Sequence, residues 1–512
     1  MEIDTGAREI VSAHRELQAI EASLNDHELR LRLITDPKSV LGTDRVLTAE
    51  VKRFAELLIG NASFRKGLQE NARATVEAFG LRVDPFELRA LWDGKALREG
   101  SLTPQDLQRE GILCLNAFNE LKRAFFSRML SAVSSNPAFD AWRHRQIARC
   151  RTEVDPVNAS AIVHAPATFE LASGCSVGCW FCGVSAEKYR GAVSYEAIRD
   201  DWLATLAALR DELGPIASKA FLYWGTEPFD NPDYEKYCLD LKAVCGGFPQ
   251  TTTAIPMRDA DRTWELIKLS AREGCLVNRF SILTPRVQSE TMARFTPAQL
   301  LFVELVLHNR GSLMVKAEAG RARNSRRLQE DRDFVTVELG EYASPALQAA
   351  RPSTIACVSG FLINLAHKEI RLISPCPASD EHPDGYVVFE RTSFGDGREA
   401  AARLRELIAR HMPMRLDATT ALAFRGDLSF ASEPDGFVLS NAFDTIAIRN
   451  KAHPALMQRV GGLIHEGRWN AEAISVALRG EFGVADAQAR GLLDLLFDKG
   501  VLRERTAVPA PI

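Results

Sequence analysis

At 512 residues, the chain is longer than a single hydrophobic core usually supports, so about two to four domains are expected. Hydrophobic residues make up 46% and charged residues 25%, a profile that excludes a disordered or collagenous chain. The formal net charge of −4 gives no overall basic field for nucleic acid, and no stretch reaches the roughly 18 apolar residues of a membrane span. We therefore expect a cytoplasmic protein that binds neither nucleic acid nor membrane.

Residues 1–150 are predicted to form a helical N-terminal region. Apolar residues recur at helical spacing over 51–58 and again over 113–126. No cluster of residues in this region points to chemistry.

Residues 151–350 alternate short apolar runs with amphipathic stretches. This alternation is typical of βαβ units, so the sequence predicts an α/β fold with a parallel sheet, closed into a partial or full barrel. In such barrels the chemistry lies at the C-terminal ends of the strands. The expected strands are 167–172, 220–223, 251–255, 278–283 and 314–317, and the clearest helices are 195–213 and 263–273.

Two further segments complete the chain. Residues 351–414 contain two apolar runs, 361–365 and 369–374, which predict a hairpin that ends at Pro-Cys-Pro. Residues 415–506 contain two strand-like runs around 432–436 and three helical patterns, at 455–465, 471–482 and 485–499. This order predicts a small winged-helix-like domain.

Of the ten cysteines, only Cys175, Cys179 and Cys182 cluster tightly, with the spacing C-x3-C-x2-C. Three thiolates can ligate three irons of a 4Fe–4S cluster and leave the fourth iron open. The loop follows the apolar run 167–172, which places it at a strand end. A zinc site is the alternative, but it would need a fourth Cys or His near by. Interleaved glycines give the loop the backbone freedom to wrap a bulky group: Gly174, Gly178 and Gly183.

The cysteine loop, Cys-Ser-Val-Gly-Cys-Trp-Phe-Cys, resembles the signature of the radical S-adenosylmethionine (SAM) superfamily, including Phe181 before the third cysteine. Further on, Trp-Gly-Thr-Glu-Pro (224–228) resembles that family's Gly-Gly-Glu-Pro motif, with Thr226 in place of the second glycine. The resemblance implies a partial TIM-like (β/α)6 radical SAM barrel over 151–350, a 4Fe–4S cluster on the three cysteines, and bound SAM. It implies that the methionine amino group of SAM is held by Gly225, Thr226, Glu227 and Pro228.

Further SAM contacts follow from the same resemblance. Ser281 and Arg279 lie on the predicted fourth strand, where the family contacts ribose or carboxylate. Lys316, Glu318 and Arg321 lie on the predicted fifth strand, in the same layer. For each residue singly, a salt-bridged or solvated place at a strand end is the open alternative. Trp180, Tyr189 and Trp224 could likewise face a substrate or fill the barrel core.

The regions outside the barrel resemble parts of peptide-modifying systems. Residues 415–506 resemble the PqqD-like peptide-recognition domain, which binds a leader peptide as an added strand at a sheet edge. Part of 1–150 resembles Nif11-like leader sequences. Residues 351–414 resemble the corresponding segment of polytheonamide-type radical SAM peptide epimerases. They also resemble the opening of SPASM and twitch auxiliary-cluster domains, but no cysteine follows Cys376 to complete such a cluster.

These resemblances imply an enzyme that converts L-residues to D-residues in a ribosomally made precursor peptide. The peptide would bind through its leader, and an electron donor such as flavodoxin or ferredoxin would supply electrons. An epimerase must return a hydrogen to the opposite face of the Cα, and a thiol can give one. Cys376, held between two prolines, and Cys357 are the expected donors. The alternatives are a radical SAM enzyme that forms thioether or carbon–carbon crosslinks, and a non-catalytic, metal-stabilised peptide-binding protein.

Overall fold

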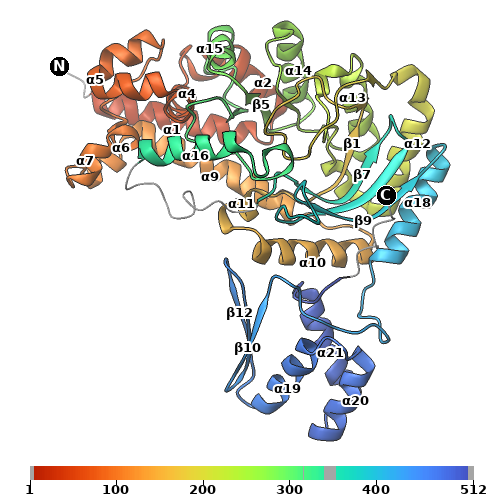
Figure 1. The fold of residues 1–512 in the computed structure, drawn as a ribbon. Coiled ribbons are helices and arrows are strands. Elements are labelled where there is room, and N and C mark those ends of the chain that lie inside the picture. The colour runs from red at the N-terminus through yellow and green to blue at the C-terminus, as the bar shows by residue number, and fades with distance from the viewer. Residues whose placement is uncertain (1–4, 315, 340–352, 505–512) are drawn as a thin grey trace.

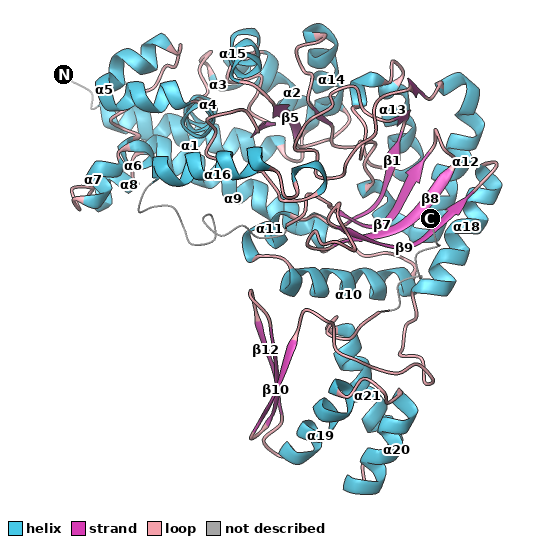
Figure 2. Ribbon diagram, viewed as in Figure 1, coloured by secondary structure: helices cyan, strands magenta, loops and turns pink. Residues whose placement is uncertain are grey.

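A computed structural model describes residues 5–314, 316–339 and 353–504 of the chain. The fold is mixed α/β: a helical N-terminal region lies beside a group of sheets and helices, and a small domain follows at the C-terminal end (Figures 1 and 2). None of the helices in these residues combines the length and the apolar character that crossing a bilayer requires.

The N-terminal region is helical, as predicted. In α4, Val51, Phe54 and Leu57 are buried at helical spacing, which gives the helix one apolar face. The side chain of Asn61 caps the next helix by accepting a hydrogen bond from the Phe64 N–H. The helices are α1 (Thr5–Ser23), α2 (His27–Thr35), α3 (Pro37–Leu41), α4 (Leu47–Gly60), α5 (Ala62–Ala78), α6 (Arg89–Trp92), α7 (Gly94–Arg98), α8 (Pro104–Leu107), α9 (Glu110–Leu130), α10 (Pro137–Glu153) and α11 (Pro156–Ala161).

The largest sheet joins segments that lie far apart in the sequence. Its strands are β1 (Ala165–Glu170), β7 (Val358–Asn364), β8 (Glu369–Pro375) and β9 (Tyr386–Ser393), in the order β1-β7-β8-β9. Strand β7 is parallel to β1, and β8 and β9 are antiparallel to their neighbours. The predicted hairpin is therefore confirmed as β7 and β8, and it extends the same sheet as the first strand of the α/β region.

A second sheet is all parallel: β4 (Thr252–Thr253), β5 (Asn278–Ile282) and β6 (Val303–Leu307). The sequence did not predict β6. The expected strand at 220–223 is reduced to one bridge, from Phe221 to Thr168 of β1. Residue 315 lies outside the described residues, and the rest of the expected strand at 314–317 is not extended in a sheet. The sheets of the described chain are not closed into a barrel.

Helices cover the sheets from outside. They include α12 (Tyr195–Leu213), α13 (Tyr234–Cys245), α14 (Ala260–Arg272), α15 (Pro285–Arg294), α16 (Arg326–Leu339) and α18 (Gly397–His411). A short antiparallel pair, β2 (Ala172–Ser173) and β3 (Gly191–Ala192), brackets the cysteine loop. Short 3-10 helices lie at Gly214–Lys219, Pro228–Asp230 and Gly320–Ala322.

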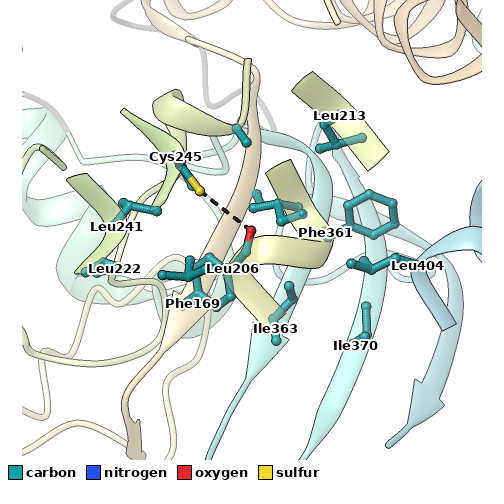
Figure 3. Packing of buried hydrophobic residues seen from close by; sticks show 14 of the residues in the cluster. Phe169, Leu206, Leu213, Leu222, Leu241, Cys245, Phe361, Ile363, Ile370 and Leu404 are labelled. Atoms are coloured by element: carbon teal, nitrogen blue, oxygen red, sulfur yellow. Dashed lines mark hydrogen bonds between the residues drawn. The ribbon is translucent and has the colours of Figure 1, made fainter. Parts of the chain in front are cut away.

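The main core lies between the largest sheet and its covering helices (Figure 3). Phe169, Phe361 and Ile363 project from the strands toward α12 and α18, where they meet Leu206 and Leu404. We call this side of the sheet, which also packs on α10, the outer face, and the opposite side the inner face. Because side chains alternate along a strand, Glu170, Leu362 and Asn364 belong to the inner face.

The C-terminal domain has a core of its own. It contains the sheet β10 (Ser429–Glu433), β11 (Gly436–Ser440) and β12 (Thr445–Arg449), followed by α19 (Pro454–His465), α20 (Ala471–Phe482) and α21 (Asp486–Asp498). Both the hairpin and the three helices agree with the sequence prediction. The domain sits against α10 (Figure 1), where the Arg145 guanidinium lies 4.1 Å from the Phe497 ring centroid.

Candidate functional site

The first residue of the cysteine loop is held by two backbone hydrogen bonds to the segment that precedes β3. The Cys175 N–H donates to the Glu187 carbonyl at 2.9 Å, and the Tyr189 N–H donates back to the Cys175 carbonyl at 3.3 Å. Gly174 has a φ of +73°, and a Cβ there would run into the Lys188 carbonyl, so only glycine fits. The loop therefore leaves β2 in a sharp turn that any larger residue would disrupt.

Asp230 holds the beginning of this loop, at Ser176. Its carboxylate accepts hydrogen bonds from the Ser176 N–H at 2.8 Å and the Ser176 hydroxyl at 2.6 Å. Arg258 pairs with the same carboxylate at 3.0 Å. Asp230 follows the Trp-Gly-Thr-Glu-Pro turn by two residues, so this short segment also positions the cysteine loop.

The three thiols lie within one loop of eight residues. Cys175, Cys179 and Cys182 are free and half-buried, and the charges of Cys175 and Cys182 both act on Cys179. Burial raises the pKa of Cys175 to about 11 and that of Cys179 to about 12. The Ala186 N–H points at the Cys182 sulfur at 3.3 Å. Thiols with such high pKa values would lose their protons only when a metal binds them.

The cysteine loop carries three side chains of the type that binds iron. In the described residues, no group of three or more His, Cys, Asp or Glu side chains is placed to hold one metal ion. A 4Fe–4S cluster would need three thiolates, and the loop supplies the three free cysteines and an N–H near the Cys182 sulfur. Gly178, at a φ of +63°, adds no side chain, and a Cβ there would meet open space.

The Trp-Gly-Thr-Glu-Pro turn lies directly beside β1. The Gly225 N–H donates to Glu170 on the inner face at 2.8 Å, and a Cβ on Gly225 would come within 2.9 Å of that carboxylate. Thr226 is half-buried and Pro228 is buried. Asn364 of β7 also donates to Glu170, at 2.6 Å. Glu170 thus ties the turn to two strands.

Glu227 is buried next to the thiols. Its carboxylate accepts hydrogen bonds from the Thr253 hydroxyl at 2.6 Å and from the Ala254 N–H at 2.8 Å. Burial raises the pKa of Glu227 to about 7 despite these bonds. The negative charge of Glu227 contributes to the raised pKa of both Cys175 and Cys179. The two sequence motifs, 42 residues apart from Cys182 to Trp224, therefore meet in space.

The residues expected on the fourth and fifth strands have different surroundings. Ser281 is half-buried on the same side of β5 as Arg279, opposite the buried Phe280 and Ile282. Glu318 pairs with Arg332 at 2.8 Å, and Lys316 pairs with Asp331, so both residues are tied to α16. These ion pairs correspond to the alternative that the sequence left open for the strand ends.

Arg321 donates hydrogen bonds to the cysteine loop. Its backbone N–H donates to the Cys182 carbonyl at 2.9 Å, and its guanidinium donates to the carbonyls of Cys179, at 3.1 Å, and Ala186. Gly320 precedes it with a φ of +55°, and a Cβ there would run into the Cys182 carbonyl. Arg321 therefore supports the loop from outside.

Sequence reasoning missed three residues of this site: Glu170, Asp230 and His308. Glu170 had a visible signal, because it is the one charged residue in an otherwise apolar strand. His308 follows β6, and its ring centroid lies 4.8 Å from that of Phe181 in the cysteine loop. Burial lowers the pKa of His308 to about 4, so its ring is neutral at physiological pH. Its Nδ1 is buried and has no hydrogen-bond partner among the described residues.

The structure separates the two expected hydrogen donors. Cys357 packs with Tyr223, Trp224 and Val184 in the apolar cluster of the inner face. Cys376 lies in the main core on the outer face, where the positive charge of Arg149 in α10 opposes the rise in its pKa. Burial raises the pKa of Cys357 to about 11 and that of Cys376 to about 12, so both are protonated thiols near neutral pH.

No model of a known protein family matches the chain. A curated relative does: the chain is 32% identical over 469 residues to the uncharacterized protein y4wI of Sinorhizobium fredii. The alignment covers 89% of this chain and 87% of that protein. The chain therefore belongs to the same protein family as y4wI of Sinorhizobium fredii.

Proposed function

We propose that the chain is a radical SAM enzyme that converts L-residues to D-residues in a ribosomally made precursor peptide. One observation carries the proposal: the loop with the three free cysteines lies against the segment that follows the Trp-Gly-Thr-Glu-Pro turn, where Asp230 accepts two hydrogen bonds from Ser176. These are the two motifs that the radical SAM resemblance pairs. When bound, the cluster and SAM would supply a 5'-deoxyadenosyl radical that removes the Cα hydrogen of the substrate.

We infer that the parallel strands form part of a TIM-like (β/α)6 barrel. Strands β1 and β7 are parallel, β4 to β6 are parallel, and Phe221 bridges to β1. The cysteine loop follows the end of β1, and the Glu227 turn follows the bridge at Phe221. Active sites of α/β barrels lie at this end of the strands, which supports the inference.

For the second hydrogen transfer, we propose Cys357 in preference to Cys376. The donor must face the space where the substrate radical forms, and Cys357 shares the inner-face cluster with Val184, two residues after the cysteine loop. Cys376 faces α10 instead. In this step the S–H bond breaks and a Cα–H bond forms. The resulting thiyl radical takes one electron from the external donor and one proton to become the thiol again.

The C-terminal domain offers sheet edges to a leader peptide. In the described chain its three-stranded sheet has β10 and β12 at its edges, and such edges can accept an added peptide strand. Arg425 holds the domain to α10 through Glu153 at 3.2 Å and Thr152 at 3.0 Å. Deleting residues from about 415 onward should lower leader affinity at least tenfold in a calorimetric titration. Unchanged affinity would refute the leader-binding role.

The test of the proposed reaction is incubation of reduced, anaerobically reconstituted protein with its precursor and SAM in D2O. A thiol exchanges its proton with solvent, so each D-residue should carry one deuterium at Cα. Chiral amino-acid analysis and mass spectrometry measure both properties. A product that has lost two hydrogens would indicate crosslinking instead. Absence of SAM cleavage would favour a peptide-binding protein without turnover.

A further inference from the structure

A large cleft opens between the N-terminal helices and the cysteine loop. Its volume is about 1340 Å³. One wall consists of residues of α4 to α7, among them Ala62 and Ala90. The opposite wall contains Trp180 of the cysteine loop and His308 after β6. Whatever occupies this cleft therefore touches the cysteine loop on one side and the N-terminal region on the other.

The size of the cleft indicates an occupant larger than a cofactor. Sites for drug-sized molecules have volumes of about 300–1,000 Å³. SAM is a molecule of that size, and none of the residues 225–228 that are expected to hold it lines the cleft.

The lining favours an extended peptide. The lining contains both apolar side chains, such as Leu58 and Leu91, and charged ones, as a site for mixed side chains requires. Four of the five acidic lining residues are paired with cations, and Asp333 has no cation partner among the described residues; the four are Asp93, Glu330, Asp331 and Glu338.

Two arginines remain available to a ligand. Arg310 and Arg327 line the cleft, and neither has a carboxylate partner among the described residues. The guanidinium of Arg327 lies 5.9 Å from the Trp180 ring centroid, beside the cysteine loop. The cleft therefore has unpaired positive charge close to the predicted site of chemistry, which favours a peptide with acidic side chains.

We propose that this cleft holds the part of the precursor peptide that flanks the residue being modified, with an acidic residue of that part near Arg310 or Arg327. The N-terminal helical region is then one wall of the substrate site. The inference rests on the proposed function and adds to it the place and the charge of the substrate segment.

Filling the cleft from its far wall tests the proposal. Ala62→Trp and Ala90→Trp should each lower the affinity for the full precursor at least tenfold in calorimetry, to that of the isolated leader. Their affinity for the isolated leader should equal that of the unmodified protein. Ala78→Trp is the matched control, because Ala78 is an exposed residue at the end of α5 outside the cleft, and it should bind both peptides normally. Normal affinity of both cleft variants for the full precursor would overturn the proposal.

A second measurement needs no activity. Amide hydrogen exchange of α5 and α6 should slow on addition of the full precursor and stay unchanged on addition of the leader alone. Protection by the leader alone would place the leader in the cleft and overturn the proposal. A precursor whose acidic residues near the modified position are changed to amides should bind at least fivefold more weakly. SAM cleavage by the unmodified protein tests the proposed function separately, so failure of either idea is recognised by its own measurement.

Discussion

The two faces of the sheet β1-β7-β8-β9 come from the same strands but have different chemistry. The outer face is apolar and packs Phe361 and Ile363 against helices, with Cys376 buried among them. The inner face carries Glu170 and Asn364, and Cys357 lies beside it. Burying a carboxylate costs free energy, and proteins retain such groups where they serve a purpose. The outer face therefore stabilises the fold, and the inner face holds the Trp-Gly-Thr-Glu-Pro turn of the site in place.

The largest effect is expected from the cysteine loop, which follows β1 and β2. Changing Cys175, Cys179 and Cys182 together to Ala should abolish the visible absorbance of a reconstituted 4Fe–4S cluster and all SAM cleavage, because the loop then has no iron ligands. Cys245→Ala, in the main core, is the control and should retain both signals. Full cluster absorbance in the triple variant would end the radical SAM assignment.

The next comparison separates the two donor cysteines by face. Cys357→Ala should still consume SAM but make at least a hundredfold fewer D-residues, because the S–H bond on the inner face is gone. Cys376→Ala should keep the rate of D-residue formation and lose about 1–2 kcal/mol of unfolding free energy, because it removes a buried group from the core. Chiral analysis of the product and urea unfolding measure the two effects. The opposite pattern would place the donor on the outer face.

Core substitutions on the outer face should lower stability more than those on the inner face. Phe361→Ala should lower the free energy of unfolding by about 3–5 kcal/mol, because Phe361 is fully buried and stacks on Phe139 at 5.9 Å. Val388→Ala, half-buried on the inner face, should cost about 1–2 kcal/mol. Urea unfolding measures both values. Equal losses would contradict the division of roles between the faces.

A smaller, pH-dependent effect is expected from His164, the residue before β1. Burial and the charge of Arg143 lower the pKa of His164 to about 3, below its ordinary value near 6.5. Between these values the unfolded chain binds the proton and the folded chain does not, so stability falls as pH falls below 6.5. The free energy of unfolding should be about 2 kcal/mol lower at pH 5 than at pH 7 through this group.

His164→Asn should remove that pH dependence. Asn tolerates the left-handed backbone of this position, where φ is +46°, and does not titrate. His144→Asn, at an exposed position of α10, should leave the dependence intact. Thermal melts of the three proteins at pH 5 and pH 7 make the comparison. The same loss of stability at pH 5 in His164→Asn would assign the effect to other groups.

Several elements were predictable because their signals are local. The helix Tyr195–Leu213 and the helix Ala471–Phe482 agree with the predicted bounds to the residue. The hairpin of β7 and β8 also follows from two apolar runs with a short connection. Periodicity, caps and turns depend on neighbouring residues, so one sequence contains them.

The cysteine spacing, the Trp-Gly-Thr-Glu-Pro turn and several helices, among them Tyr195–Leu213 and Ala471–Phe482, could be predicted from the sequence. Only the tertiary structure decided that β7 pairs with β1, that Arg321 donates hydrogen bonds to the cysteine loop, and that Cys357 and Cys376 face opposite ways. These features join segments up to about 190 residues apart, and nothing in the local pattern records such pairing. The face that a residue takes depends on strand register, and one residue of shift reverses it.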